Sequence, residues 1–269
     1  MRLLTPPLIA LAACRPGIAA VPVPDLPAAV APAAGTARYA LSEHRHVEQT
    51  VHGRSMVSDA ATRFVFSITT APTDSGFAAA VLVDAVTLEG DAGGMGTAAE
   101  ASGARLTGHF GSSGSRFVRE DDTTPHEALD QLTLSLHQVL PSLPPGGARP
   151  ETTWTDTTVV TGRVAGVPVT VISQTANRAG PWDRLDGVPL LRVTRSTTYT
   201  LAGEGSPAGS WIALRGQGVN HTEQVLDSAG GVVHGVLADT LRLEIEVGGT
   251  GVVIPVVQTR ADTLRRAIP

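Results

Sequence analysis

The 269-residue chain has no lysine and only one cysteine, and each shortage excludes a class of chemistry. All 20 basic residues are arginine, which excludes a P-loop lysine, a Schiff-base lysine and a Ser-x-x-Lys nucleophile pair. A single cysteine forms no intramolecular disulfide, no Cys-x-x-Cys redox pair and no cluster of thiolates for zinc. The net charge of −5 argues against a nucleic-acid partner, which needs a basic surface.

Residues 1–13 are predicted to be an export signal. Arg2 supplies the positive start, and the short apolar run that follows is interrupted by Pro6 and Pro7. This run is too short to cross a bilayer, because a membrane-spanning helix takes roughly 20 residues.

The only cysteine ends the run Leu11-Ala12-Ala13-Cys14. Here the chain resembles bacterial lipoproteins, whose lipobox is leucine, a small residue, glycine or alanine, and then cysteine. The resemblance implies cleavage before Cys14 and a diacylglycerol anchor on its thiol, which attaches the protein to a membrane of the cell envelope. Because Arg15 and not aspartate follows, it also implies the periplasmic face of the outer membrane in a host with two membranes. The alternatives are plain secretion, with cleavage near residues 17–19, and a cytosolic chain.

Residues 14–36 are rich in proline and alanine and are predicted to form an extended tether. The segment contains five prolines, which disfavour an amphipathic helix. A polyproline-like chain rises about 3.1 Å per residue, so the segment would reach on the order of 60 Å. We expect one folded domain at 37–262, since a chain of this length fits a single β domain, and a C-terminal tail at 263–269.

The folded part is predicted to be mainly β. Runs rich in valine, threonine, leucine and isoleucine are separated by glycine, asparagine, aspartate and proline, which is typical of antiparallel sheets. In 240–247 apolar residues alternate strictly with polar ones, so one face is expected to be buried and the other solvated. About eleven strands are expected, several of them long enough to curl the sheet. They lie near 38–52, 55–70, 76–90, 104–110, 115–120, 153–164, 167–177, 189–202, 209–225, 231–247 and 251–260.

One segment has helical periodicity instead. Thr124, Pro125 and Glu127 provide a cap, a first-turn proline and a capping-box glutamate. Apolar residues then recur at helical spacing up to Pro141, which predicts a helix of about 16 residues that closes one side of the sheet. These apolar residues are Leu129, Leu132, Leu136, Val139 and Leu140. A second, weaker helix candidate covers 94–104.

Four polar side chains on the first strand share one face and are candidates for a metal site: His44, His46, Glu48 and His52. Imidazoles and a carboxylate at this spacing can bind Zn²⁺ or Cu²⁺. The opposite face is the apolar one, so these side chains are expected to be solvated. We therefore predict no metal site, and no cofactor is expected.

Two glycine-rich runs match known site motifs only in part. The run 203–208 fits G-x-G-x-x-A, but Pro207 and a β-like segment follow where a dinucleotide site needs a helix, so a hairpin loop is expected. The run 111–115 lacks the second glycine of G-x-S-x-G, which argues against a nucleophile elbow. No catalytic residue is assigned.

Three charged residues interrupt faces that are otherwise apolar: Glu43 and Arg45 on the first strand, and Arg195 on the strand at 189–202. A charge on a core face must be paired or must reach water. We expect a bulge or a strand end to turn these side chains outward. The alternative is that they line the mouth of a cavity and contact a polar head group.

The order of lipobox, proline-rich tether and about eleven antiparallel strands with one or two helices resembles the β-clam lipoproteins and lipoprotein carriers of bacterial envelopes. The resemblance implies a mainly β fold, a large, strongly curved antiparallel sheet (a β-clam or incomplete barrel) around an apolar cavity for acyl chains. It transfers no functional residue. We expect a membrane-anchored, non-enzymatic envelope lipoprotein that binds or transfers a hydrophobic ligand. The alternatives are a structural or protein-interaction module of the envelope and a secreted hydrolase. The sequence predicts no oligomeric state.

Replacing Cys14 by serine tests the lipobox. If the thiol carries the anchor, Cys14→Ser should abolish incorporation of a labelled fatty acid and release the protein from the membrane fraction. Unchanged labelling would refute the assignment.

Overall fold

The computed structural model describes residues 26–30, 33–74, 76–90, 98–111, 114–120, 126–248 and 251–267. The predicted signal, Cys14 and most of the tether lie outside these residues. The strands are β1 (Gly35–Val51), β2 (Arg54–Thr73), β3 (Gly76–Gly90), β4 (Arg105–Gly111), β5 (Gly114–Arg119), β6 (Thr153–Val164), β7 (Val167–Leu185), β8 (Val188–Gly205), β9 (Ile212–Asp227), β10 (Val232–Val247) and β11 (Val252–Arg266). The helices are α1 (Ala98–Ala101), α2 (Glu127–Val139) and the 3-10 turn η1 (Pro207–Gly209).

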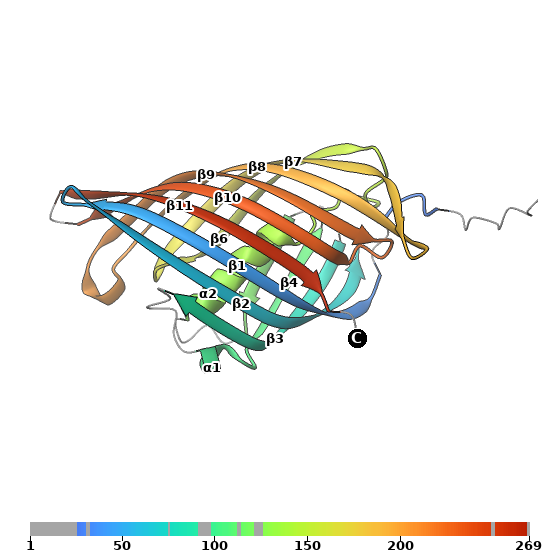
Figure 1. The fold of residues 1–269 in the computed structure, drawn as a ribbon, viewed down its shortest axis with the longest axis horizontal. Coiled ribbons are helices and arrows are strands. Elements are labelled where there is room, and N and C mark those ends of the chain that lie inside the picture. Colours follow the sequence, from blue (N-terminus) through green and yellow to red (C-terminus); the bar gives the residue numbers. More distant parts are fainter. Residues whose placement is uncertain are drawn as a thin grey trace, which may run out of the picture.

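These strands form one antiparallel sheet, in the order β5-β4-β3-β2-β1-β11-β10-β9-β8-β7-β6. Because long strands twist, the sheet curls until it is nearly closed into a barrel, with β5 and β6 as its edges (Figure 1). The helix α2 lies in the hollow of the curved sheet and contacts both edge strands. The predicted fold class, a strongly curved and incompletely closed antiparallel sheet, is confirmed.

The first and last strands are neighbours in the middle of this sheet. β1 pairs with β2 on one side and with β11 on the other, so Leu41 lies opposite both Phe64 and Leu264. All three side chains are buried, and they join the two halves of the sheet through one core.

All eleven predicted strands are present, and the differences lie at their ends. β7 runs to Leu185 instead of ending at 177, because a bulge between Ala179 and Trp182 lets the pairing with β8 continue. β11 runs to Arg266, so residues 263–266, which we expected in the C-terminal tail, belong to the sheet. The Arg266 side chain is held there by an ion pair of 2.6 Å with Asp227.

The end of the predicted tether is also part of the folded domain. Val30 is fully buried in the main core, and its N–H donates a hydrogen bond of 2.8 Å to the carbonyl of Ala148. β1 then begins at Gly35, two residues before the predicted domain boundary. The N-terminal segment therefore joins the domain at Val30.

The long helix is confirmed, but it is shorter than predicted. It begins at Glu127 with His126 as the N-cap residue, and no side-chain hydrogen bond caps it. The predicted cap, Thr124, and the predicted first-turn Pro125 lie outside the described residues. The five apolar residues predicted for its buried face are all buried. Of the weaker helix candidate at 94–104, the structure describes 98–104, and within that part the four residues of α1 are helical.

The interior of the curved sheet contains two apolar clusters. The main core packs β1 to β5, the apolar face of α2 and one end of β8 to β11. A second apolar cluster lies at the other end of the long strands and comprises Val167, Val169, Tyr199, Leu201, Leu214, Leu241, Leu243 and Val256. Polar and charged side chains lie between the two clusters, on the same concave face.

Two inward-facing glycines make room for larger side chains in this interior. A Cβ atom at Gly162 on β6 would lie 2.8 Å from a methyl carbon of Leu134, so the glycine lets α2 approach the edge strand. A Cβ atom at Gly218 on β9 would lie 2.3 Å from Cζ of Tyr199, whose ring covers that glycine.

Truncation of α2 tests whether the helix is an integral part of the core. Leu132 is fully buried, so Leu132→Ala should lower the free energy of unfolding by about 2–5 kcal/mol in urea denaturation. The matched control is Leu185→Ala, which shortens a side chain that is 60% exposed and should change stability by about 0.5 kcal/mol or less. Equal effects of the two substitutions would contradict the packing of α2 inside the sheet.

Candidate functional site

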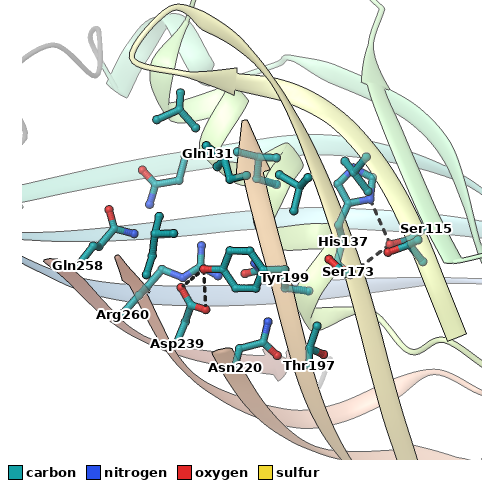
Figure 2. Close-up of a pocket in the computed structure, with 18 of the residues that line it drawn as sticks. Ser115, Gln131, His137, Ser173, Thr197, Tyr199, Asn220, Asp239, Gln258 and Arg260 are labelled. Atoms are coloured by element: carbon teal, nitrogen blue, oxygen red, sulfur yellow. Dashed lines mark hydrogen bonds between the residues drawn. The ribbon is translucent and has the colours of Figure 1, made fainter. Parts of the chain in front are cut away.

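A cavity of about 170 Å³ lies inside the curved sheet, between α2 and the concave faces of β6 to β11 and β1 (Figure 2). One part of its wall is polar and another part is apolar. Its charged residues are Arg45, Glu127, Asp156, Arg163, Arg195, Asp239 and Arg260, and its apolar residues include Val164, Val171, Leu201, Leu241 and Leu243. The cavity therefore joins the polar layer of the interior to the second apolar cluster.

The polar wall is organised around Arg260 on β11. We call Arg260, Glu43, Arg45, Asp239 and Asp262 the charged cluster. Nε of Arg260 lies 3.3 Å from Oδ2 of Asp262, and Asp262 is 2% exposed. Nη1 of Arg260 donates to Oγ of Ser135 on α2 at 3.4 Å, so the cluster also contacts the helix. Glu43, which is 1% exposed, accepts a hydrogen bond from the side-chain amide of Gln131 on the same helix.

Burial and crowding of carboxylates set the protonation of this cluster. Burial raises the pKa of Asp262 to about 7, Arg260 opposes this shift, and Glu43 adds to it. Burial also raises the pKa of Asp239, against the opposing effects of Arg260 and Tyr199. Burial alone would lower the pKa of Arg260, but the surrounding carboxylates outweigh it and raise that pKa above its ordinary value. The guanidinium thus stays charged, and Asp262 titrates near neutral pH.

Tyr199 fixes the position of Asp239 in the cavity wall. Its hydroxyl lies 3.0 Å from each carboxylate oxygen of Asp239, to which it donates, and Figure 2 shows the pair beside Arg260. Burial raises the pKa of Tyr199, and the adjacent carboxylate raises it further. The phenol is therefore neutral and remains a hydrogen-bond donor.

The C-terminal end of α2 is bound by two side chains from the sheet. Nη1 of Arg195 donates to the carbonyls of Gln138 at 3.0 Å and Leu140 at 2.8 Å, and Nε2 of Gln224 donates to that of Val139 at 2.6 Å. The last carbonyls of a helix have no partner within the helix and carry its partial negative charge. Arg195 and Gln224 satisfy them, and the helix end in turn stabilises a guanidinium that is only 8% exposed.

The expectation that Glu43, Arg45 and Arg195 are turned outward was wrong. Glu43 and Arg195 are buried, and Arg45 and Arg195 line the cavity. No bulge moves them, because both strands keep their alternation. Glu43 and Arg195 form hydrogen bonds with α2, and Arg45 interacts electrostatically with the nearby carboxylates of Glu43 and Glu127. Their inward position was visible in the alternation of the strands. The partners on α2 are distant in the sequence and gave no local signal.

The apolar part of the cavity leads toward one end of the barrel. The second apolar cluster continues there into six half-buried side chains: Val47, Val164, Val171, Ile212, Ile245 and Ile254. The connections β1–β2, β6–β7, β8–β9 and β10–β11 all lie at this end. We call this end the mouth. The main core, with Val30, closes the other end.

A serine and a histidine meet on the cavity wall near the edge strand β5. Oγ of Ser115 lies 3.1 Å from Nδ1 of His137. Figure 2 marks this contact with a dashed line. Burial lowers the pKa of His137 to about 4, so the imidazole is neutral and a weak base. Among the described residues no partner hydrogen-bonds its Nε2, whereas a catalytic triad needs a carboxylate on the second nitrogen. The pair connects β5 to α2, because Oγ of Ser115 also donates to the carbonyl of His137 at 3.2 Å.

The histidines proposed as metal candidates do not converge. His46 forms hydrogen bonds with Asp59 at 2.8 Å and Glu48 at 3.2 Å on the outer face, and these bonds raise its pKa. His44 is exposed on the same strand, and His52 lies in the β1–β2 turn. Within the described part of the chain, no three His, Cys, Asp or Glu side chains are placed to hold a metal ion.

The hairpin loop predicted at 203–208 is confirmed, because β8 and β9 pair on either side of it. The run 203–208 ends β8 and enters η1, which connects to β9. The run 111–115 connects β4 to β5, with residues 112–113 outside the described part.

Comparison with known proteins identifies no family. No protein-family model and no curated protein matches the chain. Among solved structures, it is similar to Neisserial surface protein A, with 9% identity and a TM-score of 0.23 over 87% of this chain and 99% of that chain. It is also similar to a LolA superfamily protein from Nitrosomonas europaea, with 9% identity and a TM-score of 0.18 over 86% of this chain and 87% of that chain. A DUF1329 family protein from Desulfovibrio piger is similar too, with 8% identity and a TM-score of 0.17 over 86% of this chain and 87% of that chain. These TM-scores are too low to assign a family or a function. No helix in the described residues is long and apolar enough to span a membrane.

The pKa of Asp262 predicts a pH dependence of stability. Between about pH 4 and pH 7, Asp262 keeps its proton in the folded state but loses it in the unfolded chain. Its contribution to stability is therefore greatest below about pH 4 and is lost as the pH rises. The free energy of unfolding should then fall as pH rises from about 4 to about 7, by up to about 1.4 kcal/mol per pH unit.

The measurement is urea denaturation across this pH range. Asp262→Asn cannot titrate and should give a flatter slope than the wild type. Asp183→Asn, which removes an exposed carboxylate, is the control and should keep the wild-type slope. Parallel curves for wild type and Asp262→Asn would exclude Asp262 as the titrating group.

Proposed function

We propose that the protein is a lipid-anchored envelope lipoprotein whose curved sheet binds an amphiphile. The polar part of the ligand would contact the charged cluster, and its apolar part would lie along the second apolar cluster. The observation that carries this proposal is one cavity whose wall is charged at one side and apolar toward the mouth.

The structure refines the sequence-based hypothesis of a hydrophobic ligand. A cavity for acyl chains alone would be lined by apolar side chains, because an unpaired polar group costs free energy when it faces hydrocarbon. Here Arg260, Asp239 and Gln131 line the cavity beside leucines. A ligand with both a polar and an apolar part matches both sides of the wall.

The size of the cavity limits what it holds in this conformation. A cavity of about 150 Å³ accommodates benzene. A cavity of about 170 Å³ therefore fits a head group with a few carbons, and a longer chain would leave through the mouth. The half-buried side chains at the mouth would then cover that chain and lose solvent contact.

The N-terminal segment enters the domain at the end opposite the mouth. Val30 lies near Gly230 in the β9–β10 turn, at this closed end. An anchor on Cys14 would therefore attach the domain through its closed end and leave the mouth free of the attachment.

Titration with octan-1-ol tests amphiphile binding, with the full-length chain carrying Cys14→Ser so that no attached acyl chain competes. Calorimetry should show binding of one molecule per protein. Val171 lines the cavity, so Val171→Trp should abolish binding. The neighbouring Ile172 is 47% exposed and on the outer face, so Ile172→Trp should bind as the parent does.

Circular dichroism and the urea midpoint verify that both tryptophan variants are folded. An absence of octan-1-ol binding in the parent would favour the alternative of a structural or interaction module. Binding that survives in folded Val171→Trp would place the ligand outside the cavity.

A further inference from the structure

We infer that the cavity selects an uncharged, hydroxyl-bearing head group over an anionic or a cationic one. This inference rests on the proposed amphiphile-binding function and specifies the chemistry of its ligand. Two observations carry it. The positive and negative charges at the cavity already balance each other, and the cavity wall contains hydrogen-bond donors as well as acceptors that have no hydrogen-bond partner among the described residues.

Arginines at the cavity suggest an anion at first sight, but each cavity-lining arginine that is buried is already compensated. Arg260 has three carboxyl groups around it, namely Asp262, Glu43 and Asp239. Arg195 is held by the carbonyls at the negative end of α2 and by the nearby Asp156. An anion would therefore meet carboxylates as well as guanidinium groups.

The sum of charges supports the same conclusion. The lining residues and the two carboxyl groups directly behind them, Glu43 and Asp262, include four guanidinium groups and five carboxyl groups. His137 is neutral at pH 7, and the carboxyl group of Asp262, whose pKa is about 7, is half-protonated there. The net charge of these groups is therefore close to zero. A head group of either sign would leave water for a site with almost no net opposite charge to replace its hydration, which is unfavourable.

The unpartnered atoms decide between a neutral and a charged head group. Nη2 of Arg260 and Nε of Arg45 are buried donors without a hydrogen-bond partner among the described residues. On the side of α2 that faces the cavity, Oε1 of Gln131 and Oε1 of Gln138 are buried acceptors that also have no hydrogen-bond partner among the described residues. All four side chains line the cavity.

A carboxylate or phosphate only accepts hydrogen bonds, and an ammonium group only donates them. Either one would leave half of these groups unpaired, at a cost for each. A hydroxyl group donates and accepts, so a diol or polyol head group can satisfy atoms on both walls with small side-chain shifts. This complementarity applies to a free polyol amphiphile and to an uncharged lipid head group alike.

Three ligands with the same eight-carbon chain test the inference: octane-1,2-diol, octanoate and octylamine, titrated calorimetrically into the full-length Cys14→Ser protein at pH 7. The diol should bind about tenfold or more tightly than either charged compound. Tightest binding of octanoate or octylamine would overturn the inference and leave the proposed function standing. If none of the three and no octan-1-ol binds, the proposed function itself fails.

Asp239→Asn tests the charge balance directly. The asparagine oxygen can still accept from Tyr199, but one negative charge of the cavity wall is removed. The octanoate affinity should rise relative to that of the diol by about tenfold. Asp183→Asn, on the outer surface, is the matched control and should leave the ratio unchanged.

An unchanged octanoate-to-diol ratio in folded Asp239→Asn would show that charge does not control selection. The wild-type ranking decides the question independently if this variant does not fold. A comparison of octyl glucoside with vesicles of an uncharged glycolipid then distinguishes a free ligand from a membrane head group.

Discussion

The attachment of α2 to the sheet through its C-terminal carbonyls determines the arrangement of the interior. Arg195 on β8 and Gln224 on β9 bind the last turn of the helix, and both side chains are buried. Without these donors, the last carbonyls of the helix would be unsatisfied in the buried interior. With them, α2 can lie inside the curve of the sheet and present one apolar and one polar face to different strands.

This attachment explains why the interior has two apolar clusters with a polar layer between them. The apolar face of α2 completes the main core with β1 to β5, whereas its polar face is turned toward β10 and β11. The charged cluster of the sheet contacts this polar face, through Arg260 and Glu43. Burying such a cluster is costly even when its charges are paired, and a fully apolar layer of the same shape is often at least as stable. Stability alone therefore does not explain a buried charged layer that contains a cavity, and ligand binding is consistent with it.

Most of the fold could be predicted from the sequence, because it depends on local patterns. Runs of β-favouring residues between turn residues located all eleven strands, alternation identified the buried face of the clearest ones, and helical spacing located α2. The site could not be predicted in the same way. Alternation placed Glu43 and Arg195 on the core face, but their partners are Gln131 and the carbonyls of Gln138 and Leu140, each more than fifty positions away. Tyr199 fits over Gly218 only because β8 and β9 pair in one register.

The central position of β1 also has a consequence for how the chain reaches its folded state. β1 and β11 come from opposite ends of the sequence, and Tyr39 pairs with Arg266. During synthesis, one edge of β1 stays unpaired until the last strand has been made, and contacts of such long sequence separation form slowly. An unpaired edge is open to wrong association with other strands. β1 is therefore the first strand to be synthesised but among the last to be paired on both sides.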